Sequence, residues 1–312
     1  MRVLFWGTPE FAAPPLRALL GEGHEVVGVV TQPDRPHGRH RSTVVPSPIK
    51  VIAVDEGLLV LQPERPRGDA FLDRIRELQP DVSVVVAYGH MLPRAAIDLP
   101  ASGTLNIHAS LLPRWRGAAP IQAAIRAGDS ETGVTVMRMV DRMDAGPILL
   151  QAPTPIEADE TFGELQLRLS ELGALAIMGA LTLRSLGAAT EVEQDESLAT
   201  YAPKIDRSQL FVDWSRSGDE VSRTIRAFDP RPGAVTVLRD IDVKLFGARS
   251  VTDVDGDCGT VVRIDEAGML VACGRGGVRC TLVHPSGGRR LAALDWAQGR
   301  GVRVGDVFDW PR

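Results

Sequence analysis

Two side chains that could act on a carbonyl group lie two positions apart in the sequence. Asn106 and His108 are the last polar residues of an apolar run, Thr104–His108, that we expect to form a strand. Side chains alternate between the two faces of a strand, so these two should point the same way. An amide beside an imidazole offers a donor for a developing oxyanion and a base for the proton that an attacking amine loses. Taken alone, either residue would more often be an ordinary strand-end cap than a catalyst, because short motifs match by chance.

A carboxylate could complete this pair. The segment Asp141–Gly146 follows the next expected strand, and its Asp144 could orient the imidazole or hold a water that relays protons. Aspartate is also a common turn former, which leaves a structural alternative for Asp144. After His108 the chain continues into Leu111-Leu112-Pro113. Proline cannot continue a sheet ladder, so we expect the backbone to leave the sheet there and line a crevice.

A sheet must bring these residues together. Through residues 1–150, runs rich in Val, Ile and Leu alternate with amphipathic stretches. This alternation predicts an α/β domain, a Rossmann-like, mostly parallel sheet covered on both faces, with ligands bound beyond the carboxyl ends of its strands. The expected strands are Val3–Trp6, Glu25–Thr31, Leu58–Leu61, Asp81–Ala87, Thr104–His108 and Thr132–Met139, and the expected helices are Phe11–Leu20, Phe71–Leu78 and Thr161–Leu186.

Composition divides the chain into two domains. We predict a catalytic domain over residues 1–187, a linker over 188–205 and a small, OB-like β-barrel domain over 206–312. The linker prediction rests on an acidic stretch around Glu191–Glu196 with few large apolar residues. The barrel prediction rests on short Val-rich runs separated by Gly and Asp. We expect one helix, Asp219–Phe228, followed by strands at 233–238, 243–246, 259–264, 270–273 and 278–283.

Several classes of protein are disfavoured by the sequence. We find no apolar run long enough to span a membrane and no signal-peptide pattern, so we expect a cytoplasmic protein. The three cysteines lack CxxC spacing, which favours free thiols over a disulfide or a metal site. Gly7-Thr8-Pro9 contains no dinucleotide or triphosphate fingerprint, and we expect Thr8 to cap the first helix. With a net charge of −5, a nucleic acid would have to be held by local basic patches.

The combined pattern resembles a known family. Asn106, His108, the turn Ser110–Pro113, Arg116-Gly117 and Asp144 are similar to the catalytic core of the folate-dependent formyltransferases. The resemblance implies that Asn106, His108 and Asp144 act together on 10-formyltetrahydrofolate as a co-substrate, without a metal. It also implies two segments that bind the folate, which contain Val86, Ala87, Tyr88, Gly89, Met91 and Leu92 in one and Ser110, Leu111, Leu112 and Pro113 in the other.

Three more segments, Phe5–Ala12, Thr31–Arg39 and Ile225–Ala234, are similar to the branch of this family that formylates initiator methionyl-tRNA for translation initiation. The similarity implies a monomer whose C-terminal domain binds tRNA. It also implies that the loop Arg35–Lys50, which its prolines and glycine should keep irregular, contacts the tRNA through Arg35, Arg39, Arg41 and Lys50. Composition alone would favour a solvated surface loop.

Two alternatives stay open at this point. A formyltransferase acting on a small amine, such as a ribonucleotide or an amino-sugar nucleotide, would carry the same three catalytic side chains. It would lack the second domain or the Gln32–Pro36 segment. A non-catalytic RNA-binding protein on the same scaffold gives no reason for Asn106, His108 and Asp144 to coincide.

Overall fold

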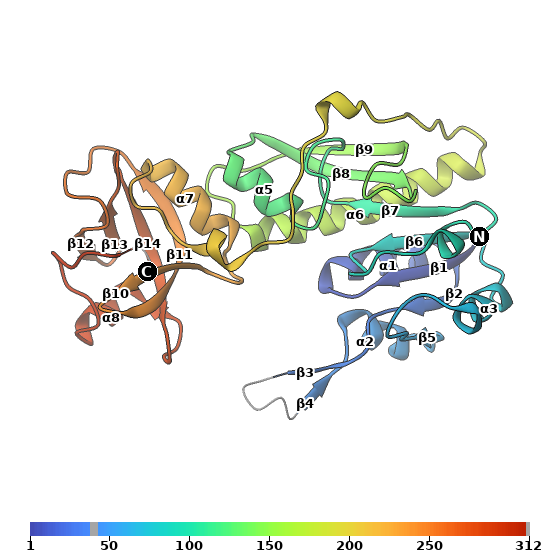
Figure 1. Cartoon of the computed structure of the whole chain (residues 1–312), viewed down its shortest axis with the longest axis horizontal. Helices are drawn as coiled ribbons and strands as arrows, with labels where there is room; N and C mark the ends of the chain where they lie inside the picture. The colour runs from blue at the N-terminus through green and yellow to red at the C-terminus, as the bar shows by residue number, and fades with distance from the viewer. Residues whose placement is uncertain (38–42, 310–312) are drawn as a thin grey trace. The chain divides into compact units, whose positions relative to one another are not determined.

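The computed structural model describes residues 1–37 and 43–309, which form parts of two compact units (Figure 1). Unit 1 comprises Met1–Gly117, Thr132–Thr154 and Gln166–Ala202. Unit 2 comprises Ala118–Glu131, Pro155–Leu165 and the chain from Pro203 onward. In the described residues, no helix is both long and apolar enough to cross a bilayer.

Unit 1 is built on a seven-stranded sheet with the order β5-β2-β1-β6-β7-β8-β9. The first five strands in this order pair in parallel, and β8 runs antiparallel to β7. This confirms the predicted mostly parallel sheet. The strands are β1 (Arg2–Gly7), β2 (Glu25–Val30), β5 (Val60–Leu61), β6 (Val82–Val86), β7 (Thr104–His108), β8 (Glu131–Arg138) and β9 (Ile148–Pro155).

Helices accompany this sheet, and the longest of them packs on β7, β8 and β9. On α6 (Phe162–Ser185), a Cβ at Gly173 would lie 3.1 Å from the side chain of Ile107, and one at Gly179 would lie 3.3 Å from Leu150. Small residues at these positions therefore allow the helix to approach the sheet closely. The other helical elements of unit 1 are η1 (Glu10–Ala12), α1 (Ala13–Gly21), α2 (Pro48–Asp55), α3 (Asp69–Glu77), α4 (Arg94–Ile97) and η2 (Glu196–Leu198).

Two local predictions were wrong. The segment 35–50 is not irregular in its described part, because β3 (Arg35–His37) pairs with β4 (Thr43–Val45) and α2 follows. β-Branched residues favour the strand, and Ser47 before Pro48 supplies a helix cap that accepts from the Lys50 amide. Thr8 does not cap the first helix. Its hydroxyl donates instead to the Tyr88 carbonyl at 3.0 Å, which ties the end of β1 to the loop after β6.

The acidic segment that follows α6 packs within unit 1. Val192 pairs with Ile148 at the start of β9, with two backbone hydrogen bonds of 2.8 and 2.9 Å. Further along, Tyr201 forms a parallel bridge with Arg116. Residues 188–202 are therefore bound to the sheet unit by backbone and side-chain contacts.

Unit 2 contains an antiparallel sheet of order β10-β11-β14-β13-β12, with β15 paired to β14. Residues near the C-terminus pair with both edges, because Val307 bridges Thr260 and Asp309 bridges Val237 of β10. These bridges close the sheet into the small barrel that was predicted. The elements of unit 2 from Pro203 onward are η3 (Arg207–Leu210), α7 (Gly218–Ala227), β10 (Ala234–Leu238), β11 (Ile241–Val251), β12 (Val261–Asp265), β13 (Gly268–Ala272), β14 (Gly277–Pro285), β15 (Leu291–Ala292) and α8 (Ala293–Gln298). Unit 2 also contains α5 (Pro120–Ala127), which contacts α7.

Candidate active site

The imidazole of His108 and the carboxylate of Asp144 meet as the sequence suggested. Nδ1 of His108 lies 3.7 Å from Oδ2 of Asp144, and the two side chains are only 6% and 16% exposed. Asn106, two residues before His108, is partly exposed, and its side chain has no hydrogen-bond partner among the described residues. An amide donor without a partner among the described residues therefore stands two positions along the same strand from a shielded imidazole–carboxylate pair.

The second ring nitrogen of His108 also has a protein partner. Nε2 lies 2.9 Å from the carbonyl oxygen of Trp115, which can only accept, so this nitrogen carries the proton. In the neutral ring, Nδ1 is then the basic nitrogen, and it faces Asp144. A protonated ring would satisfy both neighbours at once. The arrangement suits a group that takes up a proton at Nδ1 and is stabilised as a cation by the adjacent carboxylate.

The loop that carries Asp144 does not start beside His108. Because β8 is antiparallel to β7, its last residue, Arg138, pairs with Leu105, whereas His108 pairs with Thr135. The loop after β8 therefore begins at the opposite end of β7 and has to fold back. At Asp144 the backbone adopts a left-handed conformation with φ of 50°, and the carboxylate accepts a hydrogen bond of 2.8 Å from the Gly117 amide.

The turn after β7 is held by two residues that sequence analysis missed. Thr135 Oγ1 donates to the Ser110 carbonyl at 2.7 Å and accepts from the Leu112 amide at 3.1 Å. From β9, Gln151 donates to the Leu112 carbonyl at 2.9 Å. Ser110 and Leu112 are themselves buried, so Leu111 and Pro113 are the partly exposed members of this segment. Both anchoring residues are ordinary strand positions, and no sequence signal distinguishes them.

The loop after β6 combines buried and exposed residues. Val86, Tyr88 and Leu92 are buried, whereas Ala87, Gly89 and Met91 are exposed. Gly89 has φ of 90°, and a Cβ there would lie 2.6 Å from the Gln32 side-chain nitrogen. The positive φ favours glycine, and any larger residue would also have to displace the Gln32 amide. Burial raises the pKa of Tyr88 to about 12, and its hydroxyl has no hydrogen-bond partner among the described residues.

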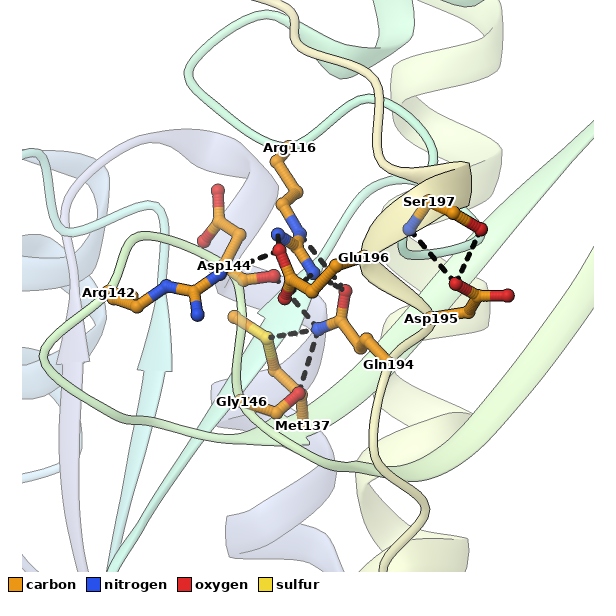
Figure 2. A network of polar contacts seen from close by, with 9 residues as sticks. All are labelled: Arg116, Met137, Arg142, Asp144, Gly146, Gln194, Asp195, Glu196 and Ser197. Carbon is orange, nitrogen blue, oxygen red and sulfur yellow. Dashed lines mark hydrogen bonds and ion pairs between the residues drawn. The ribbon is translucent and has the colours of Figure 1, made fainter.

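A buried arginine, Arg116, belongs to the same polar network as Asp144 (Figure 2). Arg116 is 1% exposed, and its guanidinium donates to both oxygens of Glu196 at 3.0 Å and to Oε1 of Gln194 at 2.8 and 3.1 Å. Hydrogen bonding to Arg116 and to Arg142 holds the pKa of the Glu196 carboxyl below its usual range. The buried cation is thus paired, and each of its three nitrogens donates at least one hydrogen bond, as burial of a charge requires.

The basic residues expected to bind tRNA are less free than the sequence suggested. Lys50 pairs with Asp34 at 2.5 Å, and the Arg35 guanidinium donates to the Gln32 side chain. Hydrogen bonds from Lys50 and Gln62 lower the pKa of Asp34. Arg39 and Arg41 lie outside the described residues.

The cysteines are free thiols, and Cys258 alone of the three is exposed. Burial raises the pKa of the Cys273 thiol to about 12 and also raises that of Cys280, so neither is a nucleophile at neutral pH. Across the part of the chain that the structure describes, no cluster of three or more His, Cys, Asp or Glu side chains is arranged to hold a metal ion.

Comparison with known families places the chain in a defined class. The model described as "Formyl transferase" matches residues 1–181, and "Formyl transferase, C-terminal domain" matches residues 204–301. The chain therefore belongs to the formyl transferase family. Within that family it is similar to methionyl-tRNA formyltransferases, including those of Marinobacter nauticus (46% identity over 300 residues, 96% of each chain) and Chromobacterium violaceum (47% over 306 residues, 98% of each chain).

Solved structures of more distant proteins share the fold. HypX from Aquifex aeolicus, solved in complex with tetrahydrofolic acid, matches with a TM-score of 0.69 at 20% identity over 95% of this chain and 46% of HypX. An N-formyltransferase from Helicobacter canadensis, solved with folinic acid and dTDP-3-aminofucose, matches with a TM-score of 0.68 at 15% identity over 90% of this chain and 98% of that protein.

Proposed function

We propose that this protein is an enzyme that transfers the formyl group of 10-formyltetrahydrofolate to the free amino group of initiator methionyl-tRNA. The product is N-formylmethionyl-tRNA for translation initiation. One observation carries the proposal: the chain is 46–47% identical, over nearly all of both chains, to proteins named methionyl-tRNA formyltransferase. The pairing of His108 with Asp144, together with an Asn106 amide that has no partner among the described residues, supplies a chemical means.

In the proposed reaction, the neutral amine of the methionyl group attacks the formyl carbon of the folate. A C–N bond forms, and the carbonyl oxygen becomes an oxyanion, to which the Asn106 amide donates a hydrogen bond. His108 takes up the proton lost by the amine at Nδ1, through a water held by Asp144, and Asp144 stabilises the resulting imidazolium. The bond between the formyl carbon and N10 of the folate then breaks, and that nitrogen receives the proton.

The folate would lie along the two exposed edges of the site. In the loop after β6, Ala87, Gly89 and Met91 are accessible, and Val86, Tyr88 and Leu92 support them from beneath. In the turn after β7, Leu111 and Pro113 are accessible, and Ser110 and Leu112 are the buried supports. None of these accessible residues is charged, so we expect them to bind the folate through shape and backbone contacts.

We assign tRNA binding to the segment Arg35–Lys50, through Arg35, Arg39, Arg41 and Lys50, and to the domain formed by residues 206–312. Because Lys50 already pairs with Asp34, its contribution requires that a phosphate compete with this carboxylate. Residues 1–187 form the formyl-folate-binding catalytic domain in this proposal, and residues 188–205 connect the two. The enzyme acts as a cytoplasmic monomer, a state that light scattering of the purified protein would test.

The direct test is an assay of the purified protein with 10-formyltetrahydrofolate and charged initiator tRNA, in which the blocked α-amine is scored. A dTDP-linked amino sugar and uncharged tRNA serve as parallel substrates. We expect formylation of methionyl-tRNA only. Transfer to the amino sugar in preference to methionyl-tRNA would replace the proposed substrate, and tRNA binding without any transfer would refute an enzymatic role.

A further inference from the structure

Gln194 is the point at which the candidate site and the acidic segment after α6 are joined (Figure 2). Its side-chain oxygen accepts from Nε and Nη2 of Arg116, and its side-chain nitrogen donates to the carbonyls of Asp144 at 2.9 Å and Gly146 at 2.7 Å. Gln194 is 9% exposed although its neighbours in sequence are exposed. One buried amide therefore connects the turn that follows His108 to the loop that carries Asp144.

The Asp144 loop needs such an attachment. The loop starts at the far end of β7 and folds back, with Asp144 in a left-handed backbone conformation that few residues besides glycine, asparagine and aspartate adopt. Where the loop returns, Gly146 packs so tightly that a Cβ would lie 1.8 Å from the Arg138 carbonyl. Both carbonyls that Gln194 binds belong to this folded-back stretch, so the amide holds the loop in the conformation that places the carboxylate next to His108.

The chemistry of the contact specifies a primary amide. The guanidinium on one side can only donate, and the two carbonyls on the other can only accept. Of the side chains of this length, only glutamine presents an acceptor to the first and a donor to the second. A glutamate at position 194 would keep the contact to Arg116 but would face lone pairs toward both carbonyls.

We propose that Gln194 is a positioning residue for formyl transfer: it fixes the Asp144 carboxylate against the His108 imidazole. This inference rests on the proposed function. It assigns a role to the segment between the two domains, whose composition suggested a linker alone. Gln194 acts through Asp144, so its removal should lower the rate of the chemical step and leave substrate binding nearly unchanged.

The test compares Gln194→Glu with Ser197→Ala as a matched control. Ser197 lies in the same segment and is exposed, and among the described residues its hydroxyl hydrogen-bonds only to Asp195. We expect Gln194→Glu to lower kcat about 10²-fold, the loss that follows a displacement of about 1 Å at an active site. KM for methionyl-tRNA should change less than about threefold by the same reasoning, because binding groups stay in place. Ser197→Ala should behave as the wild type.

A double-mutant cycle distinguishes a role that acts through Asp144 from a merely structural role of Gln194. If Gln194 works through Asp144, adding Gln194→Glu to Asp144→Asn should cost little further rate. If the two losses multiply, the inference is overturned, and an unchanged kcat in folded Gln194→Glu also overturns it. If circular dichroism shows that Gln194→Glu does not fold, the same double-mutant cycle is measured with Gln194→Met, which has a similar shape and no charge. An inactive wild type refutes the proposed function. An active wild type whose Gln194 variants keep the wild-type kcat refutes this inference alone.

Discussion

Replacing Asp144 with asparagine removes one negative charge and little else. The shape is kept, and an asparagine oxygen can still accept from the Gly117 amide, as the Asp144 carboxylate does at 2.8 Å. What is lost is the attraction between a carboxylate and the imidazolium that forms 3.7 Å away. At an effective dielectric constant of about 20, two unit charges about 4 Å apart attract by about 4 kcal/mol. Solvent reaches Asp144 in part, so we take roughly two thirds of this value, about 2.7 kcal/mol, which corresponds to about 10²-fold in rate.

The assay is steady-state formylation of methionyl-tRNA, with kcat and KM measured for both substrates. Asp141→Asn is the matched control, since Asp141 lies in the same loop, is exposed and pairs only with Arg94 among the described residues. We expect kcat of Asp144→Asn to fall about 10²-fold by this electrostatic reasoning and Asp141→Asn to remain near the wild-type value. A kcat for Asp144→Asn within about threefold of the wild type would refute the claim that the charge stabilises the imidazolium.

Three further predictions concern stability and reactivity. Tyr88→Phe should raise the thermal midpoint and add about 1 kcal/mol to the free energy of unfolding, because it removes a buried hydroxyl that lacks a partner among the described residues; a lower midpoint would contradict this reasoning. Burial raises the folded-state pKa of Asp229, so its ionisation costs stability as the pH rises through that pKa. Asp229→Asn should therefore be more stable than the wild type at pH 7, and thermal melts should show this advantage shrinking as the pH falls below that pKa. A thiol reagent should label only Cys258 in the native protein and all three cysteines in denaturant; fast native labelling of Cys273 would contradict its burial.

The sheet could be predicted because its strands are apolar on both faces. Arg2–Gly7 and Val82–Val86 are almost continuously buried, and such runs admit few other structures. The prediction for the segment 43–50 is wrong because its prolines indicate an irregular chain. Its β-branched residues and its Ser47-Pro48 cap indicate a strand and a helix start instead.

The site could be predicted in part. Asn106 and His108 share a face through strand periodicity, and that inference needs only two residues. The contact of Asp144 with His108 depends on a loop that folds back from an antiparallel strand, which no local pattern encodes. Gln194 could not be found at all, because its polar neighbours indicate an exposed linker and only the tertiary structure buries it.

The central claim is that Asn106, His108 and Asp144 act together on one formyl carbon. Single-turnover transfer to methionyl-tRNA by His108→Ala, Asn106→Ala and the double variant tests this most directly. Residues that act as a unit give losses far from additive, so we expect each single variant to lose on the order of 10²–10³ in rate and the double variant to be little slower than the worse single one. If the two losses multiply in the double variant, or if either single variant transfers at nearly the wild-type rate, the account is contradicted.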